Sequence, residues 1–115
     1  RVSWVRQARG INLGDGGDPA LQRAVRAHGN AAENMPLALI LLLAVELAGA
    51  ASWLLHGAGG ALVIGRVLHG WGLNRSAGAS FGRVAGMALT WGVMGALAGT
   101  ALAAWAGLPL PGLSA

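Results

Sequence analysis

The stretch RAVRAHGNAAENMPLALILLLAV, residues 23–45, decides the fold of this chain. Its first half carries arginine, histidine, asparagine and glutamate, whereas its second half is one of the most apolar runs in the sequence. On a helix, side chains three or four residues apart share one face. The polar residues with this spacing are Arg23, Arg26, Asn30 and Glu33. The stretch therefore predicts a membrane-spanning helix that holds a polar cluster at one end.

Composition also favours a membrane protein. The chain has 115 residues, of which 55% are hydrophobic and 10% are charged, whereas soluble domains carry about 25% charged residues. So short a chain cannot bury this much apolar surface in one soluble core. The net charge of +4 comes from arginines that cluster between apolar runs, which argues against nucleic-acid binding, because nucleic-acid domains interleave basic and aromatic residues on a polar surface. The absence of cysteine excludes thiolate metal ligands, and no metal site is predicted.

Three transmembrane helices are predicted, at residues 19–48, 52–74 and 80–108. The first has Asp18 as its N-cap and Pro19 in its first turn, and Gly49 ends it. The last carries no charge beyond its first turn and exceeds the bilayer core of about 30 Å at about 1.5 Å per residue. The middle helix is apolar enough to span, although Arg66 interrupts it. The predicted fold class is therefore an all-α membrane protein, a transmembrane helix bundle with three spans.

The arginines predict the orientation in the membrane. With three spans, one side receives Arg1, Arg6, Arg9, Arg23, Arg26, Arg75 and Arg83. The opposite connection, GAAS at residues 49–52, carries no charge. The positive-inside rule places the arginine-rich side in the cytoplasm. Residues 1–115 are expected to form a single membrane domain in which residues 1–18 are a cytoplasmic loop.

Three helix ends bring polar residues to one depth near this cytoplasmic side. These residues are Arg26, Asn30, Glu33, Arg66, His69 and Arg83. Several guanidinium groups favour an anion, and they bind carboxylates in bidentate fashion. The amide of Asn30 and the carboxylate of Glu33 would suit the amides or the ammonium group of a small peptide-like anion.

Other interpretations of the same residues stay open at this point. The cluster from Arg26 to Glu33 could be a polar network that only joins the helices. Arg66 could form a buried pair with Glu33 or another carboxylate, and His69 could be a packed, hydrogen-bonded histidine without a chemical role.

Three motifs resemble those of one family. RAVRAHGNAAENMPLALILLL (23–43), GRVLHGWGLNR (65–75) and SFGRVAGMALTW (80–91) are similar to the second-, third- and fourth-helix signatures of the MAPEG family, the membrane-associated proteins of eicosanoid and glutathione metabolism, in its bacterial branch. The resemblance implies a four-helix protomer whose first helix precedes Arg1, a homotrimer, and a bacterial inner membrane location. It also implies that glutathione, as cosubstrate, binds between protomers near the cytoplasmic face.

The resemblance implies roles for individual residues. Those at glutathione-contacting positions are Arg26, His28, Asn30, Glu33, Arg66 and His69. Arg83 matches the arginine that lies near the glutathione thiol, where a guanidinium stabilises the thiolate and acts in catalysis.

The resemblance therefore implies a glutathione-dependent transferase or peroxidase that acts on lipophilic electrophiles or hydroperoxides arriving through membrane lipid. The chain contains no tyrosine, and Asn34 and Leu73 stand where some members of the family carry one. This departure keeps a second interpretation open, a non-catalytic membrane subunit or scaffold that retains the fold and takes part in a larger membrane complex.

Overall fold

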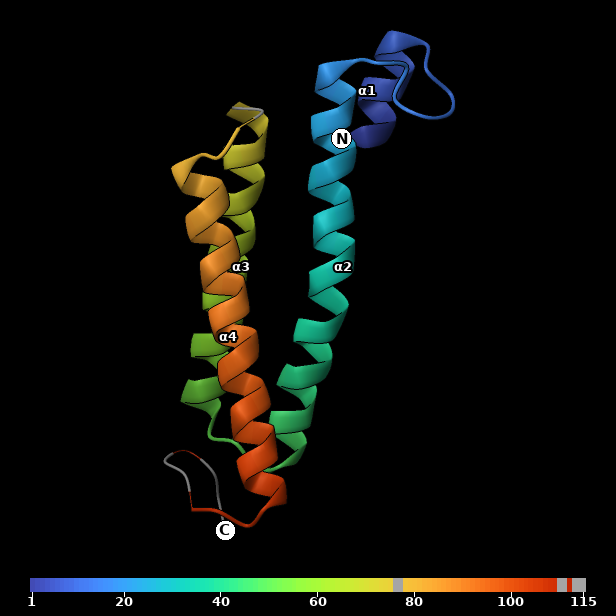
Figure 1. Cartoon of the computed structure of the whole chain (residues 1–115). Coiled ribbons are helices and arrows are strands. Elements are labelled where there is room, and N and C mark those ends of the chain that lie inside the picture. Colours follow the sequence, from blue (N-terminus) through green and yellow to red (C-terminus); the bar gives the residue numbers. More distant parts are fainter. Residues whose placement is uncertain (76–77, 110–111, 113–115) are drawn as a thin grey trace.

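The fold is a bundle of helices. The computed structural model describes residues 1–75, 78–109 and 112, and within these it contains no β-sheet. The helices are α1 (Val2–Arg9), α2 (Pro19–Leu47), α3 (Ser52–Arg75) and α4 (Phe81–Trp105). Figure 1 shows that α3 and α4 lie side by side, whereas α2 approaches them at one end of the bundle and diverges toward the other end, beside α1. The prediction of an all-α fold is confirmed.

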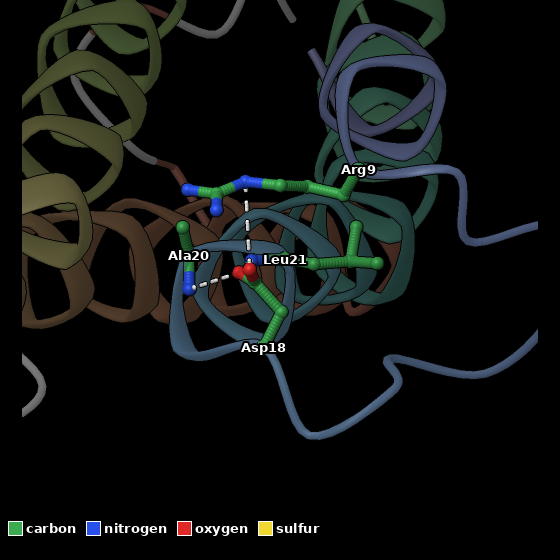
Figure 2. Close-up of polar contacts among 4 residues, drawn as sticks. All are labelled: Arg9, Asp18, Ala20 and Leu21. Carbon is green, nitrogen blue, oxygen red and sulfur yellow. Dashed lines mark hydrogen bonds and ion pairs between the residues drawn. The ribbon is translucent and has the colours of Figure 1, made fainter.

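The N-terminus of α2 is fixed by a side-chain cap (Figure 2). Asp18 Oδ1 accepts hydrogen bonds from the backbone N–H groups of Leu21 at 2.9 Å and Ala20 at 2.8 Å. The bond from Leu21 is the main reason why the pKa of the Asp18 carboxyl lies below its ordinary value. Arg9 Nε lies 3.5 Å from Asp18 Oδ2 and ties the end of α1 to this cap. The start of α2 is therefore anchored to α1.

Glycines in the left-handed conformation follow both long apolar helices. Gly49 has φ 86°, next to the C-cap of α2 at Ala48. Gly107 has φ 68° and follows the C-cap of α4 at Ala106. A residue without a Cβ adopts this conformation at no steric cost and lets the last carbonyls find partners. Because of Gly107, α4 ends earlier than the predicted 108.

The segment at residues 1–18 differs from the predicted loop, because residues 2–9 form α1. An eight-residue helix is marginal by itself. Here Val5 is buried, and α1 packs against α2. Gly10 closes the helix with φ 65°. The helix therefore combines a local stop signal at Gly10 with a tertiary contact to α2.

Two helices of the described chain, α2 and α4, are long and apolar enough to cross a membrane. The predicted third span, α3, has 24 residues, which is enough length at about 1.5 Å per residue. Its polar side chains and glycines interrupt the apolar residues, and it is not among the helices that are apolar enough to cross. Large apolar side chains on the outer surface of all three helices are exposed, which suits lipid rather than water. They include Leu39, Ile40, Leu47, Trp53, Val63, Ile64, Trp91, Leu102 and Trp105.

The backbones of α3 and α4 approach each other closely at glycines. A Cβ added to Gly86 of α4 would lie 2.5 Å from both the carbonyl oxygen of Gly65 and the backbone nitrogen of His69 on α3. A Cβ added to Gly72 of α3 would lie 2.5 Å from the backbone nitrogen of Arg83 on α4. Small residues allow this approach between membrane helices. The contact sets His69 and Arg83 at neighbouring levels of the bundle.

Candidate functional site

A cavity of about 510 Å³ lies between α2, α3 and α4. It occupies the half of the bundle nearer α1, where α2 diverges from the other two helices in Figure 1. Its lining combines cationic, amide, imidazole and apolar side chains. These belong to Arg26, Asn30, His69, Leu73, Ala79, Arg83, Val84, Met87, Ala88 and Trp91.

The polarity of the lining changes along the helix axes, and this order is the main property of the site. Arg26 and Arg83 lie at the outer end, where they also line a smaller cavity of about 200 Å³ that extends to the first turns of α2. Asn30 and His69 lie about one helical turn further inward along α2 and α3. Along α4, Met87 and Trp91 continue the wall beyond them. The cavity therefore has a cationic outer end, a polar middle and an apolar inner end.

Arg66 supports the cavity from outside its lining. Its Nη2 donates a hydrogen bond to Asn30 Oδ1 at 2.9 Å and contacts Met87 Sδ at 3.9 Å. Its Nη1 is buried and has no hydrogen-bond partner among the described residues. The pair between Arg66 and Glu33 that the sequence left open is not formed. Arg66 instead fixes the amide of Asn30, so that the Asn30 NH₂ group remains available to the cavity.

A second polar contact joins α2 to α4 at the inner end of the cavity. Trp91 Nε1 donates to Asn34 Oδ1 at 3.2 Å, and Asn34 Nδ2 donates to the backbone carbonyl of Asn30 at 2.8 Å. Neither Asn34 nor Trp91 was among the residues that the sequence predicted for the site. The missed signal is their position: at about 100° per residue, Asn34 is only about 40° from Asn30 on the helix surface. Asn34 thereby links the Trp91 ring to α2 beside the cavity.

Arg26, His69 and Arg83 differ in how the protein holds them. Arg83 Nη1 donates to the carbonyl oxygen of Gly78 at 2.6 Å. Arg26 is exposed and makes no ion pair within the described chain. His69 is only 5% exposed. The guanidinium group of Arg83 is thus bound to the connection between α3 and α4, whereas that of Arg26 is exposed on α2.

Besides Arg66, two predicted site residues lie outside the lining of the cavity. Glu33 is exposed and is absent from the lining. His28 lines a separate cavity of about 430 Å³ between α1 and α2, together with Arg1 and Ser3. His28 lies about 160° around α2 from Asn30, which explains its place on the side of α1. Glu33 points within about 20° of the direction of Arg26 but lies about two turns further along α2. The chain thus brings together Arg26, Asn30, His69 and Arg83, with Arg66 adjoining them.

The cavity is electrostatically one-sided. Arginines line its outer end, and no aspartate or glutamate is among its lining residues. Among the described residues, the one ion pair between side chains joins Arg9 and Asp18, away from the cavity. Guanidinium groups near the membrane are costly unless they face water or an anionic partner. The arrangement is suited to an anion with carboxylates at one end and an apolar region at the other.

Comparisons with known proteins identify the family of the chain. The model of the MAPEG family matches residues 1–103. The chain belongs to the MAPEG family. The Inner membrane protein YecN of Escherichia coli K12 is 39% identical over 90 residues, which cover 78% of this chain and 67% of that protein. The protein of the same name from Escherichia coli O6:H1 matches with the same identity and coverage. No solved structure matches the chain.

Membership in the MAPEG family confirms the family prediction and, with the two membrane-length helices, the prediction of a membrane protein. The E. coli relative is, by its name, an inner membrane protein, which is the location predicted for this MAPEG chain. The family match also covers α2, α3, α4 as far as residue 103, and every residue that lines the cavity.

Proposed function

We propose that this MAPEG protein binds glutathione in the cavity between α2, α3 and α4 and uses it as cosubstrate. The reaction is conjugation to a lipophilic electrophile or reduction of a lipophilic hydroperoxide. The observation that carries the proposal is the order of the lining, with arginines at the outer end and apolar side chains at the inner end. The cavity volume of about 510 Å³ lies in the range of about 300–1,000 Å³ that is usual for small-molecule sites.

The chemistry of glutathione fits this order. Its two carboxylates would bind the guanidinium groups of Arg26 and Arg83, because charge-assisted hydrogen bonds of this type are the strong ones. The free NH₂ group of Asn30 would donate to a peptide carbonyl. The thiol would then lie toward His69 and Met87, where a lipophilic reactant can approach along the apolar wall. Cationic groups nearby would stabilise the thiolate, which is the reactive form.

The surroundings of the site bear on the lipophilic substrate, the homotrimer and the cytoplasmic orientation that the proposal includes. A lipophilic substrate would enter from the bilayer, past the exposed ring of Trp91. Assembly as a homotrimer would cover part of the large apolar side chains that the helices expose. The arginine-rich end would face the cytoplasm, the compartment that supplies glutathione to an inner membrane protein.

A second candidate is a non-catalytic membrane subunit that keeps the MAPEG fold within a larger complex. The observation that favours it is the short hydrogen bond from Arg83 to the carbonyl oxygen of Gly78. This bond gives Arg83 a structural role in the connection between α3 and α4. The absence of tyrosine from the chain points in the same direction.

Arg26→Ala is expected to weaken glutathione binding by about tenfold and so to lower, without abolishing, the thermal stabilisation by glutathione, together with kcat/KM for conjugation. At a glutathione concentration of about 100 times Kd, a single site stabilises the folded protein by about 2.7 kcal/mol. The measurement is the melting temperature of the detergent-solubilised protein during a glutathione titration.

The matched control is Arg75→Ala, because Arg75 is exposed and stacks on Trp71, with 4.4 Å from its Cζ atom to the ring centroid, outside the cavity lining. This variant should respond to glutathione like the wild type. A wild-type protein that copurifies with a larger complex and shows no shift with glutathione would favour the non-catalytic subunit instead.

A further inference from the structure

His69 lies where the polar and apolar parts of the cavity meet. It is on α3, one turn inward from Leu73, and its backbone packs against Gly86 of α4. Outward of it are the guanidinium groups of Arg26 and Arg83, and inward is the wall of Met87. If the carboxylates of glutathione bind at the outer end and a lipophilic reactant binds at the inner end, the glutathione sulfur meets the reactant at the level of His69.

The imidazole of His69 is buried but faces the cavity. The residue is 5% exposed, and its ring makes no hydrogen bond within the described part of the chain. The buried side-chain atoms without a partner among the described residues are Arg66 Nη1 and Ser80 Oγ. The ring nitrogens of His69 are not among them and border the open space of the cavity, where they are placed to bond to a ligand. Arg83, the residue that the resemblance placed at the thiol, lies further out and already donates to Gly78.

We propose that His69 is the proton acceptor for the thiol of bound glutathione and returns this proton to the product. The inference rests on the proposed function. In conjugate addition to an α,β-unsaturated aldehyde, a ring nitrogen of His69 takes the thiol proton, and the sulfur electron pair forms the S–C bond at the β carbon. The C=C electron pair moves to the α carbon as the enolate, which takes the proton back from His69. No further reactant is needed, and the imidazole ends neutral.

The charges around His69 favour this proton cycle. The charged groups that face the cavity or adjoin it are Arg26 on α2, Arg66 on α3 and Arg83 on α4. The same cations favour the thiolate, and the thiolate in turn compensates the imidazolium while the pair exists. The imidazolium therefore forms only together with the anion and loses its proton once the enolate appears.

His69→Gln is expected to lower kcat for the addition of glutathione to trans-2-nonenal by about 10²-fold, the lower part of the range for general acid–base catalysis. The Kd for glutathione should stay within about threefold of the wild type, because the ring contributes little to anion binding. The control is His56→Gln, since His56 is an exposed histidine of the same helix whose Nδ1 bonds to the carbonyl of Ser52 at the opposite end. This control should keep the wild-type kcat.

The pH profile separates a chemical role from a structural one. Without the imidazole, kcat/KM should rise with the fraction of free thiolate up to about pH 8.5, whereas the wild type should level off at lower pH. His69→Asn is the second variant, and a melting temperature without ligand near that of the wild type qualifies either variant as folded. Equal kcat and pH profiles for His69→Gln and His56→Gln, or loss of glutathione binding in both His69 variants, would overturn the role of His69. Absence of glutathione binding by the wild type would instead overturn the proposed function.

Discussion

Gly86→Ala is expected to lower the melting temperature of the detergent-solubilised protein by at least about 5 °C, which corresponds to about 1–3 kcal/mol of overpacking. The added Cβ would lie 2.5 Å from the carbonyl oxygen of Gly65 and from the backbone nitrogen of His69. Both neighbours are backbone atoms within α3, so neither can move without the helix. The substitution therefore forces α3 and α4 apart at the level of the cavity.

Gly92→Ala is the matched control on the same helix, because a Cβ at Gly92 meets no atom within 4 Å. Alanine also has the better intrinsic helix propensity. This variant should be as stable as the wild type or more stable. Equal melting temperatures for Gly86→Ala and Gly92→Ala would show that the close contact between α3 and α4 does not hold the bundle together.

Asn30→Leu is expected to destabilise the protein by about 1.5–3 kcal/mol in the absence of glutathione, the usual contribution of a hydrogen bond to a charged group. Asn30 Oδ1 accepts from Arg66 Nη2 at 2.9 Å, and the other contact of this nitrogen is the thioether of Met87. Arg66 Nη1 is already buried without a partner among the described residues. Removing the Asn30 amide therefore leaves the Arg66 guanidinium with the Met87 thioether as its remaining side-chain contact. The measurement is the melting temperature without ligand.

A double-mutant cycle tests the reason for this loss. Arg66→Met in the Asn30→Leu background removes both partners together, and such a replacement by apolar groups is often neutral or stabilising. The double variant should recover most of the stability lost in Asn30→Leu. If the two single effects simply add, Asn30 does not act through Arg66.

The ends of the long helices follow from local signals in the sequence. The predicted range 19–48 corresponds to Pro19–Leu47 in α2, and 52–74 corresponds to Ser52–Arg75 in α3. The signals are the Asp18 carboxylate with its two backbone donors and the left-handed conformation at Gly49. Both act within a few residues, so they can be recognised without knowledge of the tertiary structure.

Contacts between helices could be predicted only in part. Spacing alone put Arg26, Asn30 and Glu33 on one helix face, but the rotation of α2 toward α3 and α4 decides which edge of that face borders the cavity. In the structure this edge includes Asn34, through Trp91, and leaves Glu33 exposed. The hydrogen bond from Arg66 to Asn30 spans 36 residues. Such a long-range pair depends on helix packing, which the periodicity of a single segment does not contain.

Binding of glutathione compared with its monoethyl ester tests the central claim, that the cavity is an anion site built on arginine. Isothermal titration of the detergent-solubilised protein should give an ester Kd at least about tenfold higher, since losing one charge-assisted contact corresponds to about 1.4 kcal/mol or more. Arg26→Ala should reduce this difference, and Arg75→Ala should keep it. Equal Kd values for the two ligands in the wild type, or a difference that Arg26→Ala leaves intact, would contradict the account.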